Sequence, residues 1–518
     1  MISFNVLTGS GETRKGAEGV RRESVDLSGK RTEWKRFTIF RAGTERFRLF
    51  FSRYCPPLRV SRHKKGEINT VDTLNSIVNA VNGILWDKNL LLFLLVGTGI
   101  FFTIRTNFVQ VRKFRSAFGR VFGSLTLRGD KAGKEGMSSF QALTTAVAAQ
   151  VGTGNIAGCA TALVSGGPGA IFWMWVSAFF GMATIYGEAV LAQDTKTRDE
   201  QGHVTGGPVY YIRKAFKGGL GKFMAVFFSV AIILALGFMG NMVQSNSISE
   251  AFFTAFGVPK LIMGIICAVI AGFIFIGGVS RIASFTEKVV PIMAVLYIVG
   301  SIILLIINIR NLPGAIASIF IGAFNPQAVG GAAAGITVRE AMRFGVARGL
   351  FSNEAGMGST PHAHAMAKVD EPGHQGETAM VGVFIDTFIV LNMTALVILS
   401  SGLLGTDGLT GTALAQAAFA TGFGSFGAMF VAICLLFFAF STIIGWYFFG
   451  QANVKVLFGN RGVLPYTIIV VVFILLGSLM KVDIVWNASD MFNGLMVIPN
   501  LLAVLALSGL VVKEAKKK

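Results

Sequence analysis

Charged residues and cysteines are both scarce in this chain of 518 residues. Only 14% of the residues are Asp, Glu, Lys or Arg, whereas 53% are hydrophobic. A soluble domain carries about 25% charged residues, so the deficit argues against a water-soluble protein and indicates one that lies in lipid. The four cysteines have no paired spacing, and three of them stand in apolar runs. Neither a disulfide framework nor a zinc site is therefore indicated.

Motifs that mark enzymes and channels are also lacking. The chain contains no H-E-x-x-H motif, nucleophile elbow or phosphate-binding loop in the right context. His362 and His364 are two residues apart, and on a helix such side chains point about 200° away from each other, so they cannot share one metal ion. Asn325-Pro326-Gln327 resembles a half-helix cap of a water channel, but a channel of that kind needs two. An enzyme and a channel are therefore both disfavoured.

Long apolar runs take the place of these features. Each run has about 17 to 25 mostly apolar residues, the length that crosses a hydrocarbon core of about 30 Å as a helix. The sequence therefore predicts an all-α membrane protein with eleven spans in the lipid bilayer. The predicted spans are 88–104, 140–165, 169–193, 222–247, 260–278, 286–308, 340–366, 378–402, 426–450, 464–480 and 488–512.

Basic residues are distributed unevenly among the loops. The loops after the first and third spans and the C-terminal tail are rich in Lys and Arg, whereas 403–425 contains neither. Basic loops are retained in the cytoplasm. We therefore expect a multi-pass protein of a bacterial inner (plasma) membrane, with its C-terminus cytoplasmic and the N-terminus of the first span outside. The net charge of +19 then reflects loop position, so no nucleic-acid partner is expected.

The basic stretch 1–70 conflicts with this orientation, because it would have to lie outside the cell without an apolar secretory core. A nucleic-acid-binding tail and a regulatory tail are two interpretations. We favour a third, in which 1–70 is a disordered extension outside the working protein. The membrane domain is then expected to be 71–518.

Two spans contain glycine-rich polar segments near their midpoints, namely 148–158 and 351–361. Lipid cannot satisfy exposed backbone groups, so such segments must line a cavity or be covered by protein. A broken helix also offers partial charges that suit a carboxylate, an ammonium group or Na⁺. Tight helix packing would explain one such segment. Here, however, one such segment stands at the start of each of two consecutive five-helix sets, 140–308 and 340–512. This arrangement predicts an inverted repeat.

Glu354 lies in the second of these segments, and a carboxyl group at that depth is costly and by default functional. Three roles stay open for it. It binds the ammonium group of a ligand, it pairs with Arg348 or Arg343, or it caps unwound backbone as a neutral acid. Glu188 and Asp386 are expected to support the residues of the site from behind or to pair helices.

The ninth span carries the adjacent hydroxyl residues Ser441 and Thr442. Such hydroxyls commonly bond carbonyl groups of their own helix. The alternative is that they supply hard oxygen ligands to Na⁺, together with carbonyl groups of the first broken helix. Trp446, one turn later, is placed to cover a pocket.

Three segments together resemble the pattern of the alanine or glycine:cation symporter family: 151–158 (VGTGNIAG), 166–176 (GGPGAIFWMWV) and 352–358 (SNEAGMG). The resemblance extends from about residue 72 to the end of the chain. It implies a LeuT-type fold with an inverted five-helix repeat and one extra leading helix at 88–104. It also implies Na⁺-coupled import of a small neutral amino acid, alanine or glycine, by alternating access. The alternative is a proton-coupled carrier of the same fold, with Glu354 or His364 carrying the proton.

The resemblance further implies which residues form the site. Phe351, Met357 and Trp446 would leave room for a small side chain only, and Asn241 and Gln244 are weaker candidates. A second Na⁺, the preferred amino acid and the oligomeric state are left open. The implied substrate-binding residues are Gln150, Thr153, Gly154, Asn155, Phe351, Ser352, Glu354, Met357 and Trp446. The implied Na⁺ ligands are the carbonyl oxygens of Ala148, Val151 and Phe438 and the hydroxyl groups of Ser441 and Thr442.

Overall fold

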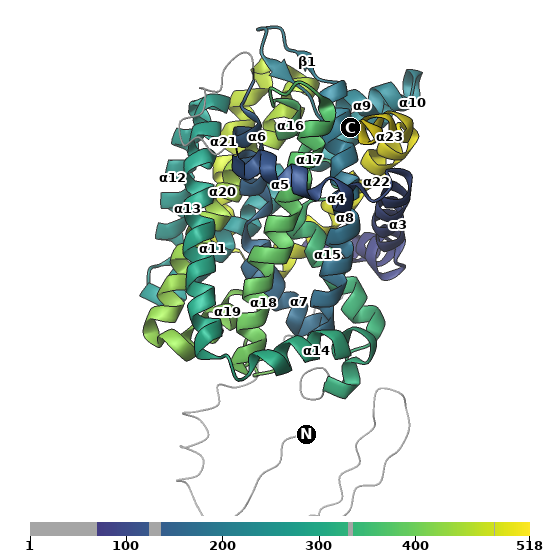
Figure 1. Cartoon of the computed structure of the whole chain (residues 1–518). Coiled ribbons are helices and arrows are strands. Elements are labelled where there is room, and N and C mark those ends of the chain that lie inside the picture. Colours follow the sequence, from purple (N-terminus) through teal and green to yellow (C-terminus); the bar gives the residue numbers. More distant parts are fainter. Residues whose placement is uncertain (1–69, 124–135, 330–334, 481, 518) are drawn as a thin grey trace, which may run out of the picture. The chain divides into compact units, whose positions relative to one another are not determined.

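A computed structural model describes residues 70–123, 136–329, 335–480 and 482–517 (Figure 1). The predicted extension 1–70 therefore lies outside the described residues, apart from Thr70. The described part is almost wholly helical. It contains one two-stranded antiparallel sheet, formed by β1 (Thr197–Arg198) and β2 (Val204–Thr205).

The helices are given in chain order in two groups, up to α13 and from α14 on. The symbol η marks a π-helical or 3₁₀-helical segment. The first group is α2 (Thr70–Asn82), η1 (Gly83–Asp87), α3 (Leu90–Arg105), α4 (Val109–Arg112), α5 (Phe114–Gly123), α6 (Ser139–Gln150), η2 (Gly154–Gly158), α7 (Cys159–Gly166), α8 (Gly169–Asp194), α9 (Pro208–Ala215), α10 (Gly218–Ile232), η3 (Ile233–Gly240), α11 (Asn241–Phe256), α12 (Lys260–Ile276) and α13 (Gly278–Ile307). The second group is α14 (Leu312–Phe324), η4 (Pro326–Val329), α15 (Val338–Asn353), α16 (Pro361–Ala365), α17 (Pro372–Val383), η6 (Phe384–Leu391), α18 (Asn392–Ser401), α19 (Gly411–Phe423), α20 (Ser425–Phe458), η7 (Asn460–Gly462), α21 (Val463–Leu479), α22 (Val482–Ala506) and α23 (Ser508–Lys516).

Every predicted span coincides with helical segments of the structure. Within the described residues, eight helices are long and apolar enough to cross a membrane, or nine if α6 and α7 count as one span bent by 47°. The remaining two predicted spans correspond to α12, a shorter apolar helix, and to α15 with α16. The count of eleven spans and the inverted repeat therefore stay predictions.

The outside of the bundle is apolar, and its largely apolar interior also contains a set of buried polar side chains. Phe273 and Ile276 of α12 are 65% and 81% exposed, while many Ser, Thr, Asn and Gln side chains inside the bundle are buried. Apolar side chains are compatible with lipid, whereas polar groups in a membrane must find partners within the protein. The polar centre is therefore where a function is expected.

The ends of the bundle carry different loops. Figure 1 shows the β1–β2 hairpin, α9 and the C-terminus at one end, and α14 and α19 at the other. The loop after the third predicted span and the C-terminal tail, both predicted to be cytoplasmic, thus share an end. The predicted outer loop 403–425, which contains α19, is at the opposite end. Which end faces the cytoplasm stays a prediction.

The two broken helices begin in the same way, each with a capping box. The hydroxyl group of Ser138 accepts from the Gln141 amide at 3.0 Å, and the Gln141 side chain accepts from the Ser138 amide at 3.1 Å. Thr337 and Glu340 exchange the equivalent bonds at the start of α15. Such boxes satisfy orphan amides and fix where a helix begins. The 12 residues of α6 extend about 18 Å, somewhat more than half of a hydrocarbon core of about 30 Å.

Candidate functional site

The two breaks lie side by side at the centre of the bundle. A methyl group added to Gly154 would lie 3.2 Å from the Cα atom of Ser352. The Gln150 side chain, at the end of α6, donates from Nε2 to the carbonyl oxygen of Asn353 at 2.7 Å. The residues predicted to bind substrate are all buried. The structure therefore brings the predicted residues of both breaks together.

Five oxygen atoms converge between the first break and α20. The hydroxyl oxygen of Thr442 lies 2.9 Å from the Ala148 carbonyl oxygen, 3.4 Å from that of Val151 and 3.0 Å from that of Phe438. The Ser441 hydroxyl lies 2.9 Å from the Phe438 carbonyl oxygen and 3.5 Å from that of Ala148. The first interpretation of these hydroxyls is confirmed, since both bond the Phe438 carbonyl oxygen of their own helix. They also face the break, and their role as Na⁺ ligands stays a prediction. Uncharged hydroxyl and carbonyl oxygens suit a hard monovalent cation.

Glycine allows α20 to come this close to α6. A methyl group added to Gly445 would lie 3.0 Å from Cβ and 3.2 Å from Cα and N of Ala149. A side chain at this position would therefore push the two helices apart. The spacing of the five oxygens depends on this contact.

Two amides of the first break are held by side-chain oxygens. The Thr153 amide donates to Gln244 Oε1 at 3.0 Å, and the Gly152 amide donates to Asn155 Oδ1 at 2.9 Å. Gln244, expected to be a weaker candidate, thus contacts the break directly. Within the described residues, the hydroxyl group of Thr153 and Oε1 of Gln150 are buried without a hydrogen-bond partner. Buried polar atoms normally have partners, so these two are available to a ligand.

Asp386 connects the two breaks. Asn155 Nδ2 donates to its Oδ1 atom at 2.7 Å, and the Ser352 hydroxyl lies 2.9 and 3.1 Å from its two oxygens. The Thr387 hydroxyl also donates to this carboxylate, at 2.9 Å. Asp386 was expected to support the residues of the site from behind or to pair helices, and it contacts residues of both breaks. The position of an acidic residue deep within an apolar span is the sequence feature that indicated Asp386.

Of the three roles left open for Glu354, pairing with Arg348 or Arg343 does not occur in this structure. Glu354 accepts instead from the Ser359 hydroxyl at 2.5 Å and from the indole N–H of Trp446. Its φ of 57° is left-handed, and it follows the last residue of α15. Its side chain therefore leaves the helix face on which the arginines stand.

The two arginines of α15 have other partners. Arg348 forms a bidentate pair with Asp490 of α22, at 2.8 and 2.9 Å. Arg343 lies 2.8 Å from Asp87. These pairs join α15 to α22 and to η1.

Aromatic rings cover one side of the breaks. Phe351 makes an edge-to-face contact with Trp446, with ring centroids 5.5 Å apart, and a tilted contact with Trp486 of α22 at 4.7 Å. Such geometries are the favoured ones for aromatic pairs. Met357 is buried in the second break. Sequence analysis did not identify Trp486, because nothing in its local pattern places it beside Phe351.

Glu188 of α8 holds the unwound second break. Its carboxylate accepts from the amides of Gly356 and Gly358, both at 2.9 Å, and from Asn500 Nδ2 at 2.6 Å. Gly356 and Gly358 have φ values of +91° and +78°, which glycine adopts without strain. Glu188 thus satisfies backbone groups that the interrupted helix leaves without partners.

A solved structure with a similar arrangement of helices is that of MhsT in complex with L-phenylalanine. It matches with a TM-score of 0.51 and 15% identity, over 75% of this chain and 98% of that one. At this identity the likeness concerns the fold alone. MhsT is a LeuT-fold transporter, so the helices of this chain have a LeuT-type arrangement.

Sequence relatives are closer. The chain is 44% identical to the sodium/alanine symporter AgcS of Methanococcus maripaludis over 445 residues, which are 85% of this chain and 96% of that protein. It is 43% identical to the probable sodium/glutamine symporter GlnT of Bacillus subtilis over 446 residues, 86% of this chain and 90% of that protein. The model of the sodium:alanine symporter family matches residues 71–517. With this match over most of its length, and with its long apolar helices, the chain belongs to the sodium:alanine symporter family of multi-pass membrane transporters.

Proposed function

We propose that this protein imports a small neutral amino acid, alanine or glycine, together with Na⁺ by alternating access. The observation that carries the proposal is the convergence of Ser441 and Thr442 on the carbonyl oxygens of Ala148 and Val151. An ion at this point touches both α20 and the first break. Its arrival and departure therefore control how the break is positioned.

The substrate carboxylate binds at the first break in this proposal. The amides of Thr153 and Gly154 lie at a helix interruption, where partial positive charge favours an anion. Gln244 occupies the Thr153 amide at 3.0 Å, and the arriving carboxylate takes its place. Ser352 and Glu354 form the opposite wall. Phe351, with Trp446 and Met357, limits the size of the side chain that fits.

The binding of Na⁺ and the binding of substrate are coupled, because both occur at the first break. Since Na⁺ and substrate both order the segment around Thr153, each raises the affinity of the protein for the other by the same factor. A membrane potential of about 100 mV adds about 2.3 kcal/mol for each charge moved, which drives an accumulation of about 40- to 50-fold.

The proposal includes a topology. Eleven spans form one leading helix and two inverted five-helix repeats within residues 71–518. The hairpin end of the bundle and the C-terminus face the cytoplasm, as the basic loops predict. The stretch 1–70 takes no part in transport.

Uptake of labelled alanine into proteoliposomes tests the proposal, with an inward Na⁺ gradient, an inward proton gradient, or neither. Wild-type protein should take up alanine only with Na⁺, and Thr442→Ala should lose this uptake. Thr421→Ala is the matched control, because within the described residues its hydroxyl bonds only the Ala418 carbonyl oxygen of its own helix, at 2.7 Å. Uptake driven by protons and indifferent to Na⁺ would refute the sodium assignment.

Proton coupling is the alternative, and one set of contacts favours it. Glu354 is a buried carboxyl group bonded to the Ser359 hydroxyl, and His362 Nδ1 donates to the Ser359 carbonyl oxygen at 2.7 Å. Under this alternative Glu354→Gln abolishes pH-driven uptake, whereas Thr442→Ala leaves uptake intact. The opposite result supports Na⁺.

A further inference from the structure

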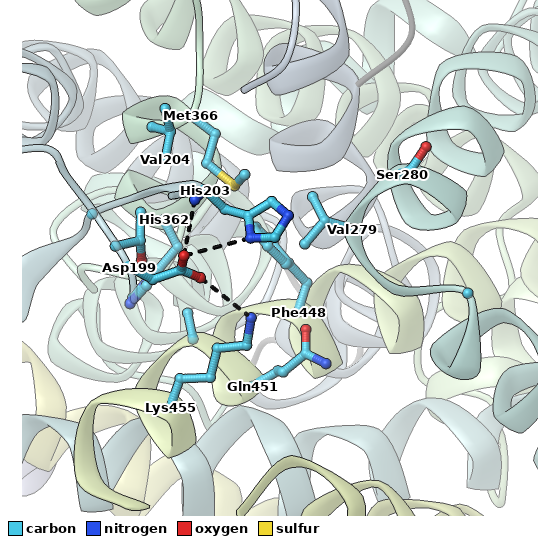
Figure 2. Close-up of a pocket in the computed structure, with 14 residues that line it drawn as sticks. Asp199, His203, Val204, Val279, Ser280, His362, Met366, Phe448, Gln451 and Lys455 are labelled. Atoms are coloured by element: carbon cyan, nitrogen blue, oxygen red, sulfur yellow. Dashed lines mark hydrogen bonds and ion pairs between the residues drawn. The ribbon is translucent and has the colours of Figure 1, made fainter. Parts of the chain in front are cut away.

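A cavity lies at the end of the bundle that carries the hairpin and the C-terminus. Its volume is about 330 Å³, and its walls come from the β1–β2 hairpin, the start of α13, α16 and α20 (Figure 2). Pockets for small ligands typically begin at about 300 Å³. The cavity is therefore suited to a ligand of amino-acid size.

One wall carries a fixed negative charge. Asp199 Oδ1 accepts from the amides of Gln201 at 3.0 Å and His203 at 2.9 Å, so the turn between the two strands holds the carboxylate in place. The His203 ring also lies near it, with Nδ1 3.4 Å from Oδ1. The carboxylate is thus positioned before any ligand arrives, which lowers the cost of binding.

A positively charged side chain lies close to Asp199 and is held only loosely. Lys455 of α20 has its Nζ atom 4.0 Å from Asp199 Oδ2, and 35% of its side chain is exposed. Figure 2 shows Asp199 between His203 and Lys455. Exposed ion pairs contribute little stability, so little is lost when this pair separates. A zwitterionic ligand has an ammonium group and a carboxylate, which together can replace the Asp199–Lys455 pair.

The cavity is joined to the central site through α16. Its lining includes His362, whose Nδ1–H donates to the Ser359 carbonyl oxygen at 2.7 Å and whose Nε2 accepts from Asn453 at 2.8 Å. The Ser359 hydroxyl in turn donates to Glu354 at 2.5 Å. One turn of chain therefore separates the cavity from the second break.

The hairpin rests directly on α16. Methyl groups added to Gly206 and Gly207 would lie 2.5 Å from Ala365 Cβ and 2.6 Å from a ring carbon of His362. The segment after β2 therefore follows any movement of the second broken helix. The same cavity is lined by α20, whose Thr442 lies about 20 Å along the helix from Lys455.

We propose that this cavity is an inner binding site for the zwitterionic amino acid as it leaves the central site. The ammonium group pairs with Asp199 and the carboxylate with Lys455. The inference rests on the proposed function, and it adds a second site that is reached from the hairpin end of the bundle.

The test compares the KM for labelled alanine at the two faces, in right-side-out and inside-out vesicles, under the same ion gradient. Lys455→Gln and Asp199→Asn should each raise the KM at the hairpin face about tenfold, because each removes a charged partner of the zwitterion. The KM at the opposite face should stay within about twofold of wild type. Lys455→Arg keeps the charge and should preserve both values. Lys214→Gln is the matched control, because Lys214 pairs with Asp194 outside the cavity, at 2.6 Å.

Two results would overturn the inner site: unchanged KM values at both faces, or an equal rise at both. If Lys455→Gln does not reach the membrane, the comparison of Asp199→Asn with Lys455→Arg decides in its place. A different result would refute the proposed function, namely alanine uptake that needs no Na⁺ in wild-type vesicles of either orientation. The KM comparison between the two faces would still be decisive in that case.

Discussion

Asn155 and Asp386 join the first broken helix to η6 through a hydrogen bond of 2.7 Å. The same carboxylate accepts from Ser352 of the second broken helix, at 2.9 Å. A single buried acid therefore fixes the distance between the two segments proposed to hold the substrate. Hydrogen bonds to a charged group contribute about 1.5–3 kcal/mol, so this contact is among the stronger ones at the site.

We expect Asp386→Asn to reduce alanine uptake by about tenfold or more and to lower the melting temperature. An asparagine has one acceptor oxygen, so one of the donors now held by the carboxylate would face an amide N–H₂ group. Asp407→Asn, in an exposed loop, should behave like wild type. An Asp386→Asn protein with wild-type uptake and melting temperature would show that the carboxylate does not organise the site.

Gly445→Ala should weaken activation of transport by Na⁺. The added methyl group lies 3.0–3.2 Å from three atoms of Ala149, so α20 must move away from α6 and the five oxygens separate. Gly272→Ala is the control, since its nearest neighbour is a Val471 methyl group at 3.6 Å. That change should leave uptake unaltered and favour the helix by about 0.5–1 kcal/mol. Equal Na⁺ activation in the two variants would contradict the account of the contact.

Glu188→Gln should lower the thermal stability of the purified protein. Glutamine keeps one acceptor oxygen, so the amide of Gly356 or of Gly358 loses its partner, at a cost of about 1–3 kcal/mol. Glu371→Gln changes a carboxyl group that is 45% exposed and should have little effect. The melting temperatures of the two variants provide the measurement. A Glu188→Gln protein as stable as wild type would mean that the second break is held by other contacts.

Phe351→Ala should widen the range of amino acids that the protein accepts. The change removes the ring that packs between Trp446 and Trp486, with centroids 5.5 and 4.7 Å away. Glutamine should then compete with labelled alanine at lower concentrations than it does in wild type. Phe351→Leu should have an intermediate effect, and Phe426→Ala, on the exposed surface of α20, should have none. If the inhibition curves for glutamine do not shift, Phe351 does not limit substrate size.

Sequence patterns were sufficient to locate the helices and both breaks. The breaks at 148–158 and 351–361 are visible because glycine and amide residues are costly at mid-membrane unless they are covered by protein. The two breaks therefore depend on composition and depth alone. The pairing of Thr442 with the carbonyl oxygens of Ala148 and Val151 came from the family resemblance, and the structure places these atoms 2.9 and 3.4 Å apart.

Contacts between helices that are far apart in the sequence cannot be predicted from a single sequence. Gln244 reaches the Thr153 amide, and Glu188 reaches Gly356, only because of how α11 and α8 are rotated in the bundle. A single sequence gives the depth of such residues and says little about their rotation. The sequence also could not decide among the roles of Glu354, because its left-handed backbone, which turns the side chain away from Arg348, is not visible in the pattern.

The Na⁺ concentration that half-activates alanine uptake, compared among wild type, Thr442→Ser and Thr442→Ala, decides whether Na⁺ binds between α20 and the first broken helix. Serine keeps the hydroxyl oxygen that lies 2.9 Å from the Ala148 carbonyl oxygen, and alanine removes it. We expect a value near wild type for Thr442→Ser, and for Thr442→Ala a rise of about tenfold or more, or no Na⁺ activation. Equal half-activation in all three proteins would contradict the placement of the ion between α20 and the first broken helix.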